Sequence, residues 1–181
     1  LTTAQVTALT SDQLNGMASD DLQAMTTNQI KALSTDQMSA LSTVQVPLLQ
    51  TTQIAALSSL QVAKLSSDAI ASLTTDQVKQ LSTAALNALS TGQLAALESD
   101  AIAALTTTQL SKLDSQQVVK LSTSQIEALT TAQTQALTTA QIAALTSDQV
   151  NNMASDDLKA LTSTQVRALT TAQISTLTAA Q

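Results

Sequence analysis

The side chains of this chain that could do chemistry are mainly carboxylates, hydroxyls and amides, because its 181 residues include no His, Cys, Phe, Tyr or Trp. Without His and Cys there is no imidazole or thiolate for nucleophilic catalysis or metal binding, and no disulfide. Without aromatic rings there is no stacking platform for bases or sugars. No charged pair recurs often enough to indicate acid–base catalysis. We therefore predict that the protein is not an enzyme and holds no cofactor.

Carboxylates are densest in two short segments that share the sequence Ser-Asp-Asp. Their acidic residues are Asp20, Asp21, Asp156 and Asp157. Calcium is bound by carboxylate and other oxygens, so each pair is a candidate calcium site. Two carboxylates are few for an ion that takes about six to eight oxygen ligands, and helix capping or a solvated surface accounts for them more simply. We predict no metal site, with these four residues as the weak candidates.

Hydroxyls and amides form the second candidate surface. Rows of Ser and Thr could order water, as in repetitive ice-binding proteins, or could serve as helix caps and as hydrogen bonds between neighbouring coils. Gln could form stacked amide ladders or complete the helix caps. The four methionines stand where Leu or Ile stands elsewhere, so we interpret them as core residues and not as a soft-metal site. They are Met17, Met25, Met38 and Met153.

Charge and hydropathy exclude two classes of partner. Seven basic and thirteen acidic residues give a net charge of −6, which disfavours nucleic acid and anionic membranes. No apolar run reaches the length of about 18 residues that spans a bilayer, so we predict no membrane insertion. Leu1 and Gln181 both fall within the repeat described next, and we expect the chain to be an excerpt of a longer protein.

An eight-residue repeat organises the whole chain, with the pattern Leu, Ser/Thr, Ser/Thr, any, Gln, aliphatic, any, Ala. Position 1 occurs 23 times, as 20 Leu and three Met, without an insertion or deletion. Position 6 is aliphatic or Met in every complete octad except at Thr134. Position 5 is Gln 18 times, and the exceptions are Asp21, Ala69, Ala85, Ala101 and Asp157. We predict a single octad-repeat solenoid over residues 1–181, with 22 full octads and a partial one.

The chain also has a longer sequence repeat of 136 residues, which equals 17 octads. Residues 1–45 match residues 137–181. Seventeen octads are not a whole number of coils if each coil holds two, three or four octads. The copied segment then lies on another side of the solenoid, which favours a uniform array. The sequence leaves the number of octads in a coil open.

Each octad carries the signals of a helix N-terminus. Ser34 and Gln37 fit a capping box, and Leu33 and Met38 fit the hydrophobic staple around it. We predict an all-α repeat solenoid of short capped helices of about 1.5 turns, one per octad, with Pro47 disfavouring the helix in its own octad. Position 2 or position 3 could be the cap. A β-solenoid is the alternative, since Thr, Val and Ile suit strands, whereas the scarcity of Gly and Pro argues against its corners.

The interior of the predicted solenoid consists of positions 1 and 6. Position 8, usually Ala, is expected to be partly buried. Position 7 is expected to face water, because it carries Lys31, Lys79, Glu127, Lys159 and Arg167. Stacking on neighbouring octads must supply the stability that helices of this length lack alone.

The octad at residues 137–144 with the first residue of the next, Leu137-Thr138-Thr139-Ala140-Gln141-Ile142-Ala143-Ala144-Leu145, resembles the LTTxQIxAL-type octapeptide-repeat tracts of very large secreted or cell-surface bacterial proteins. The resemblance covers essentially the whole chain. It implies an extracellular, structural role, as part of a filament or adhesin stalk that associates with itself or with neighbouring repeats. The alternative function is a ligand- or ice-binding solenoid that uses the Ser/Thr face.

Overall fold

The computed structural model describes residues 1–178, so the last three residues of the partial octad, 179–181, lie outside the described residues. Each of the 22 complete octads forms one short helix, and no strand occurs in residues 1–178. The predicted fold class is therefore confirmed, and the β-solenoid alternative is wrong. Contacts group the helices into two compact units, unit 1 (Leu1–Leu97) and unit 2, which begins at Glu98. The prediction of a single solenoid remains a prediction.

Unit 1 contains eleven α-helices and one 3₁₀ helix. They are α1 (Thr3–Thr7), α2 (Ser11–Asn15), α3 (Ser19–Gln23), α4 (Thr27–Ala32), α5 (Thr35–Ala40), η1 (Val46–Leu48), α6 (Thr51–Ala56), α7 (Ser59–Lys64), α8 (Ser67–Ala71), α9 (Thr75–Gln80), α10 (Thr83–Ala88) and α11 (Thr91–Ala96). The 3₁₀ helix replaces an α-helix in the octad of Pro47, as predicted, because proline has no N–H for the helical hydrogen bond.

Unit 2 contains ten α-helices among its described residues. They are α12 (Ser99–Ala104), α13 (Thr107–Lys112), α14 (Ser115–Val118), α15 (Thr123–Glu127), α16 (Thr131–Ala136), α17 (Thr139–Ala144), α18 (Ser147–Asn151), α19 (Ser155–Lys159), α20 (Ser163–Ala168) and α21 (Thr171–Ser175). With four to six residues each, these helices have between one and two turns.

Position 2 of the octad is the N-cap, and helices begin at position 3, which resolves the choice between the two positions. In α5 the Ser34 Oγ accepts from the Gln37 N–H at 3.2 Å, and the Gln37 Oε1 accepts from the Ser34 N–H at 2.8 Å. Where position 2 is Ala18 or Ala154, no side chain caps the helix. The position-3 hydroxyls lie in the first helical residue, mostly exposed or half-exposed.

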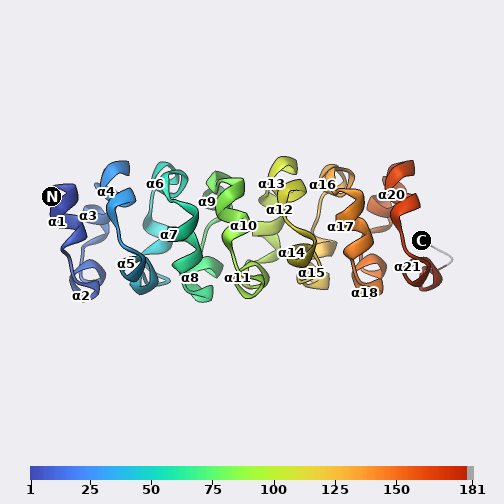
Figure 1. Cartoon of the computed structure of the whole chain (residues 1–181), viewed down its shortest axis with the longest axis horizontal. Coiled ribbons are helices and arrows are strands. Elements are labelled where there is room, and N and C mark those ends of the chain that lie inside the picture. The colour runs from blue at the N-terminus through green and yellow to red at the C-terminus, as the bar shows by residue number, and fades with distance from the viewer. Residues whose placement is uncertain (179–181) are drawn as a thin grey trace. The chain divides into compact units, whose positions relative to one another are not determined.

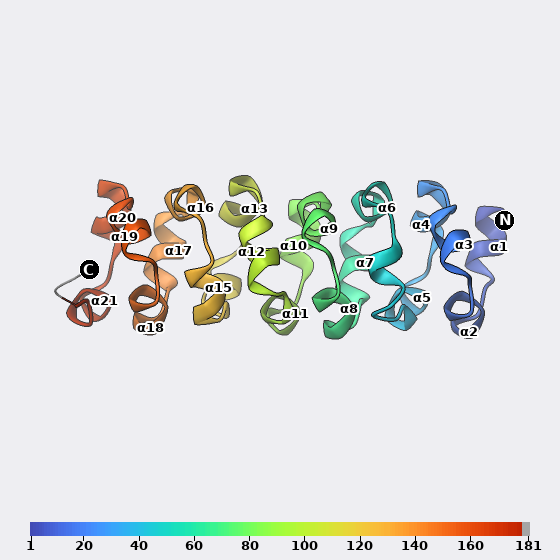
Figure 2. The ribbon, with the colours of Figure 1, turned by 180° about the vertical axis from the view of Figure 1, so that it is seen from behind.

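Within each unit, helices pack against the helix of the third octad along the chain. In unit 1 the packed pairs include α1 with α4, α4 with α6, α2 with α5, α5 with α7 and α7 with α10. In unit 2 they include α13 with α16, α16 with α19, α14 with α17 and α17 with α20. Figures 1 and 2 show this succession from opposite sides, for example α1, α4 and α6 side by side in unit 1.

The core of each unit is built from positions 1 and 6, as predicted. Leu41 and Leu113 at position 1 are each 3% exposed, and Met38 and Ile142 at position 6 are fully buried. Position 8 is mostly half-buried and position 7 mostly exposed. Burial of one such aliphatic side chain contributes about 1.5–3 kcal/mol, and packing of this kind stabilises helices that would not form alone. None of the helices in residues 1–178 has the length and apolar character needed to cross a membrane.

Candidate functional site: a glutamine seam between coils

The Gln of position 5 is the most regular polar side chain of the interior. It is the third residue of its helix, one residue before the buried aliphatic position 6. Gln37 is 3% exposed and Gln141 is 2% exposed. A buried amide has to form hydrogen bonds, because it loses those it would make with water.

The oxygen of this amide closes the capping box of its own helix. The Gln141 Oε1 accepts from the Thr138 N–H at 2.7 Å, while the Thr138 Oγ1 accepts from the Gln141 N–H at 3.2 Å. The same reciprocal pair recurs in most octads of both units. It fixes the side chain so that its NH₂ group points away from its own helix N-terminus.

The nitrogen of the amide bonds to the backbone 31 and 28 residues earlier. The Gln141 Nε2 donates to the carbonyl oxygens of Leu110 at 2.9 Å and Leu113 at 2.7 Å. In unit 1, the Gln61 Nε2 donates to Ile30 at 2.9 Å and Leu33 at 3.0 Å. We call these amides the glutamine seam. Those that donate to an earlier carbonyl of the same unit include Gln29, Gln37, Gln45, Gln53, Gln61, Gln77, Gln93, Gln133, Gln141, Gln149, Gln165 and Gln173.

The seam defines the length of a coil, which the sequence left open. Each helix packs on the helix three octads later, whereas the seam joins a helix end to the start of the helix four octads later. A coil therefore closes between three and four octads within each unit.

Glutamine suits this position because one uncharged group must accept once and donate twice. The carbonyls that it reaches lie at the C-terminal end of a short helix, where the helix dipole is negative. The Leu110 carbonyl accepts from the Leu113 N–H at 3.2 Å as well as from the Gln141 amide. A carboxylate would repel these carbonyls, and a hydroxyl would be too short to reach them. The seam thus satisfies the start of one helix and the end of another with a single side chain.

The sequence predicted the capping-box role of this glutamine, with a stacked amide ladder as the alternative, but not its bonds to the carbonyls of an earlier helix. A signal was present, since a capping box accepts Glu as well as Gln, yet position 5 is never Glu in this chain. The stacked-ladder interpretation is wrong for the seam, because its amide N–H groups donate to backbone carbonyls.

The exceptions at position 5 interrupt the seam. Ala69 and Ala85 retain their N-cap hydroxyls, from Ser66 and Ser82, but have no amide to donate. Asp157 is 4% exposed and accepts from the Thr131 Oγ1 at 2.7 Å.

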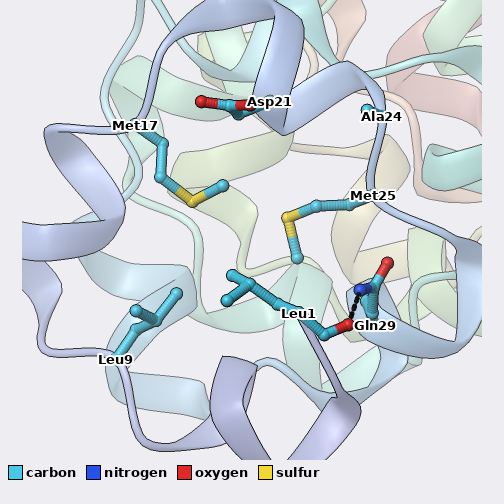
Figure 3. A pocket seen from close by; sticks show the side chains of 7 residues that line it. All are labelled: Leu1, Leu9, Met17, Asp21, Ala24, Met25 and Gln29. Carbon is cyan, nitrogen blue, oxygen red and sulfur yellow. Dashed lines mark hydrogen bonds between the residues drawn. The ribbon is translucent and has the colours of Figure 1, made fainter.

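The structure places the calcium candidates in two different surroundings. Asp20 and Asp21 are exposed, and Asp21 borders an open cavity of about 400 Å³ in unit 1, lined mainly by Leu and Met side chains (Figure 3). Asp156 is exposed and its Oδ1 lies 3.5 Å from the Lys159 Nζ, whereas Asp157 is buried. No group of three or more His, Cys, Asp or Glu side chains within residues 1–178 is arranged to hold a metal ion. Within residues 1–178, no third side chain of these types joins either Asp pair to form a calcium site.

The methionines and the Ser/Thr hydroxyls occupy regular positions of the octad. Met38, Met25 and Met153 are buried, and Met17 is half-buried, in agreement with a core role. Most position-2 hydroxyls accept the capping N–H, which uses part of their hydrogen-bonding capacity. An ice- or ligand-binding use of the Ser/Thr face stays a prediction.

Comparison with known protein families gave one description for the whole tract. The sequence model of the ALTTAQ repeat matches residues 15–51, 46–83, 75–107, 102–139, 123–155 and 150–181. The matches overlap and leave only the first fourteen residues outside. The prediction of an octapeptide-type repeat tract is therefore confirmed. No curated protein was found to match the chain.

Proposed function

Because the chain belongs to the ALTTAQ repeat family, we propose that it is a structural, non-enzymatic segment of an extracellular bacterial filament or adhesin stalk. The observation that carries this proposal is the glutamine seam. An octad such as that of Gln141 brings one acceptor for its own helix start and two donated bonds for an earlier helix end. Such a unit can be repeated without limit, because its bonding requirements are met by other copies of itself.

The uniformity of the octad supports a spacer better than a binding protein. A ligand site needs side chains that differ from their surroundings, whereas positions 1, 3 and 6 keep one chemical type in nearly every octad and the variation lies mainly at the exposed position 4 and at positions 7 and 8. The partners that fit best are the neighbouring repeats of the same chain or further copies of it. The composition supports an extracellular location, since without Cys or His the chain has few groups that react with oxidants or metals.

The spacer function is tested by changing the number of octads. Insertion of a further 17 octads, the 136-residue period, should lengthen a spacer in proportion to the octads added. Small-angle scattering would measure the maximum dimension of the original and lengthened chains. A maximum dimension that grew only with the cube root of mass, as for a globular protein, would overturn the proposal.

The location is tested separately. An antibody against the octad, applied to intact cells of the source organism, should label their surface or the surrounding medium. Labelling that required permeabilised cells would refute the extracellular part of the proposal. Thermal hysteresis of the purified chain would support the alternative ice-binding function, and its absence would remove it.

A further inference from the structure

Three departures from the octad pattern meet at one helix pair of unit 2, α16 and α19. These helices pack against each other. Two side-chain hydrogen bonds join them: the Thr131 Oγ1 donates to the Asp157 Oδ1 at 2.7 Å, and the Gln135 Nε2 donates to the Ala160 carbonyl at 3.2 Å. Neither bond belongs to the glutamine seam.

The first departure is a buried hydroxyl in the core. Thr134 occupies position 6 of α16 and is fully buried. Its Oγ1 has no hydrogen-bond partner. A hydroxyl in this state has lost its bonds to water and gained none, which lowers the stability of the coil that contains it.

The second and third departures lie at the start of α19. Position 2 is Ala154, so no side chain caps the helix. Position 5 is Asp157, whose side chain has no N–H to donate to the carbonyls of Ile126 and Leu129, 31 and 28 residues earlier. The neighbouring octads keep both features, as Gln149 donates to Val118 and Leu121. Helix α19 is thus held to the preceding coil without the two bonds that hold α18.

From this convergence we infer that the α16–α19 pair is the opening point of unit 2, where two successive coils separate before the coils around them. Local opening begins where buried polar groups are unsatisfied and where an element lacks bonds that its neighbours have. Two side-chain hydrogen bonds join α16 and α19, but one of them uses the buried Asp157 carboxylate in place of a seam amide. The opening point itself does not depend on the proposed function. Its use, as a place where a stalk under load yields reversibly, rests on that function.

Native-state amide hydrogen exchange on the whole chain tests the order of opening. The amides of α16 should exchange before those of α17, which follows it in the chain. Both helices have seam bonds, from Gln133 and Gln165 at α16 and from Gln141 and Gln173 at α17, so the order reports the unpaired Thr134 hydroxyl and the contact with α19. Fraying from the C-terminal side would open α17 first, so the order separates the two processes. Exchange of α16 together with or after α17 would overturn the inference.

Two substitutions with matched controls locate the cause. Thr134→Val replaces the hydroxyl by a methyl group of similar size, with Val already present at position 6 in α18 and elsewhere, and should slow exchange in α16 about tenfold. Asp157→Gln should slow exchange in α19 by a similar factor. The controls are Thr108→Val and Asp156→Gln, at exposed positions of the same unit.

The controls should leave α16 and α19 exchange within about twofold of the original chain. If the controls slowed exchange as much as the test substitutions, or the test substitutions slowed exchange evenly throughout unit 2, the inference would be wrong. A negative result would leave the spacer function untouched, since that is measured by length and location. Circular dichroism of each variant confirms that the helices are retained before exchange is compared.

Discussion

Residues 1–45 and 137–178 have closely matched sequences and closely matched helices, but the same positions are buried to different extents. Both copies begin with a capping box, formed by Thr2 and Gln5 in α1 and by Thr138 and Gln141 in α17. Gln5 is nevertheless exposed, whereas Gln141 is 2% exposed. The residues that Gln141 bonds to lie 31 and 28 positions earlier, and the corresponding positions before Gln5 fall outside the sequence.

The contrast reverses towards the end of each copy. Ile30 and Met38 are fully buried in the first copy, where Gln61 of a later octad donates to the Ile30 carbonyl. Their counterparts in the second copy, Val166 and Ile174, are 48% and 51% exposed. The octad therefore determines its own helix through contacts within four residues, while the burial of its core positions depends on the coils before and after it.

The largest difference between the copies is expected when a seam glutamine becomes a carboxylate. Gln141→Glu keeps the acceptor for the Thr138 N–H but places a buried charge against the Leu110 and Leu113 carbonyls. We expect a loss of about 3 kcal/mol in the free energy of unfolding at pH 7, the scale found for an unpaired buried charge. Gln5→Glu, at the matching and exposed position of the first copy, should lower the free energy of unfolding by no more than about 0.5 kcal/mol. Urea denaturation followed by circular dichroism measures both, and equal losses would contradict the role of the seam.

The same substitution predicts a pH dependence. Burial and the facing carbonyls raise the folded-state pKa of the carboxyl introduced at position 141 above its unfolded-state value of about 4.3. The stability cost is therefore small below that unfolded value and grows as the pH rises through it. We expect the difference from the original chain to shrink between about pH 7 and pH 3, with each variant compared with the original at the same pH. A difference independent of pH would show that charge is not the cause.

The next largest effect should come from restoring the seam where the second copy lacks it. Asp157→Gln gives unit 2 the missing amide and removes a buried carboxylate, at the cost of the bond from Thr131. We expect a gain of about 1.5 kcal/mol in the free energy of unfolding. Asp21→Gln makes the same change at the matching, exposed position of the first copy. It should alter the free energy of unfolding by less than about 0.5 kcal/mol. A gain of the same size at both sites would mean that helix capping, and not burial, is responsible.

Loss of an N-cap, in contrast, should affect both copies equally. Thr10 caps α2 and Thr146 caps α18 with similar distances to the capped N–H, 3.2 and 3.1 Å. Thr10→Ala and Thr146→Ala should each lower the local stability of their helix by about 1 kcal/mol, because the interaction stays within one octad. Residue-resolved amide exchange of α2 and α18 measures the loss. A cap worth clearly more in one copy would show that coil contacts contribute to it.

The features predicted correctly from the sequence are those that depend on neighbouring residues. The Ser34–Gln37 capping box specifies α5 by itself, and the proline at position 47 accounts for the shorter η1. The apolar spacing also identified positions 1 and 6 as the core, since only those two recur as large aliphatic residues.

The features that could not be predicted depend on how the chain returns after one coil. A coil of between three and four octads results from packing between helices that are distant in sequence. The sequence of a single octad does not specify how successive helices are turned relative to one another. The calcium candidates show the same limit, because Asp21 and Asp157 have matching sequence neighbours and yet only Asp157 is buried. The bonds that the seam amides donate could not be predicted either, because their acceptors lie 28 and 31 residues earlier in the sequence.

The smallest expected effect concerns an ion pair present in only one copy. In α19 the Lys159 Nζ lies 3.5 Å from the Asp156 Oδ1, with both side chains largely exposed, whereas the first copy has Gln23 at the lysine position. Exposed pairs of this kind contribute little because water and salt screen them. Lys159→Gln should therefore lower the free energy of unfolding by at most about 0.5 kcal/mol, and Gln23→Lys should raise it by no more than the same amount. Both changes should fade when denaturation is repeated in about 1 M salt, where the screening length falls to about 3 Å. An effect that survived high salt would have to come from packing of the lysine stem, and the two copies would then differ in their surfaces as well as in their seams.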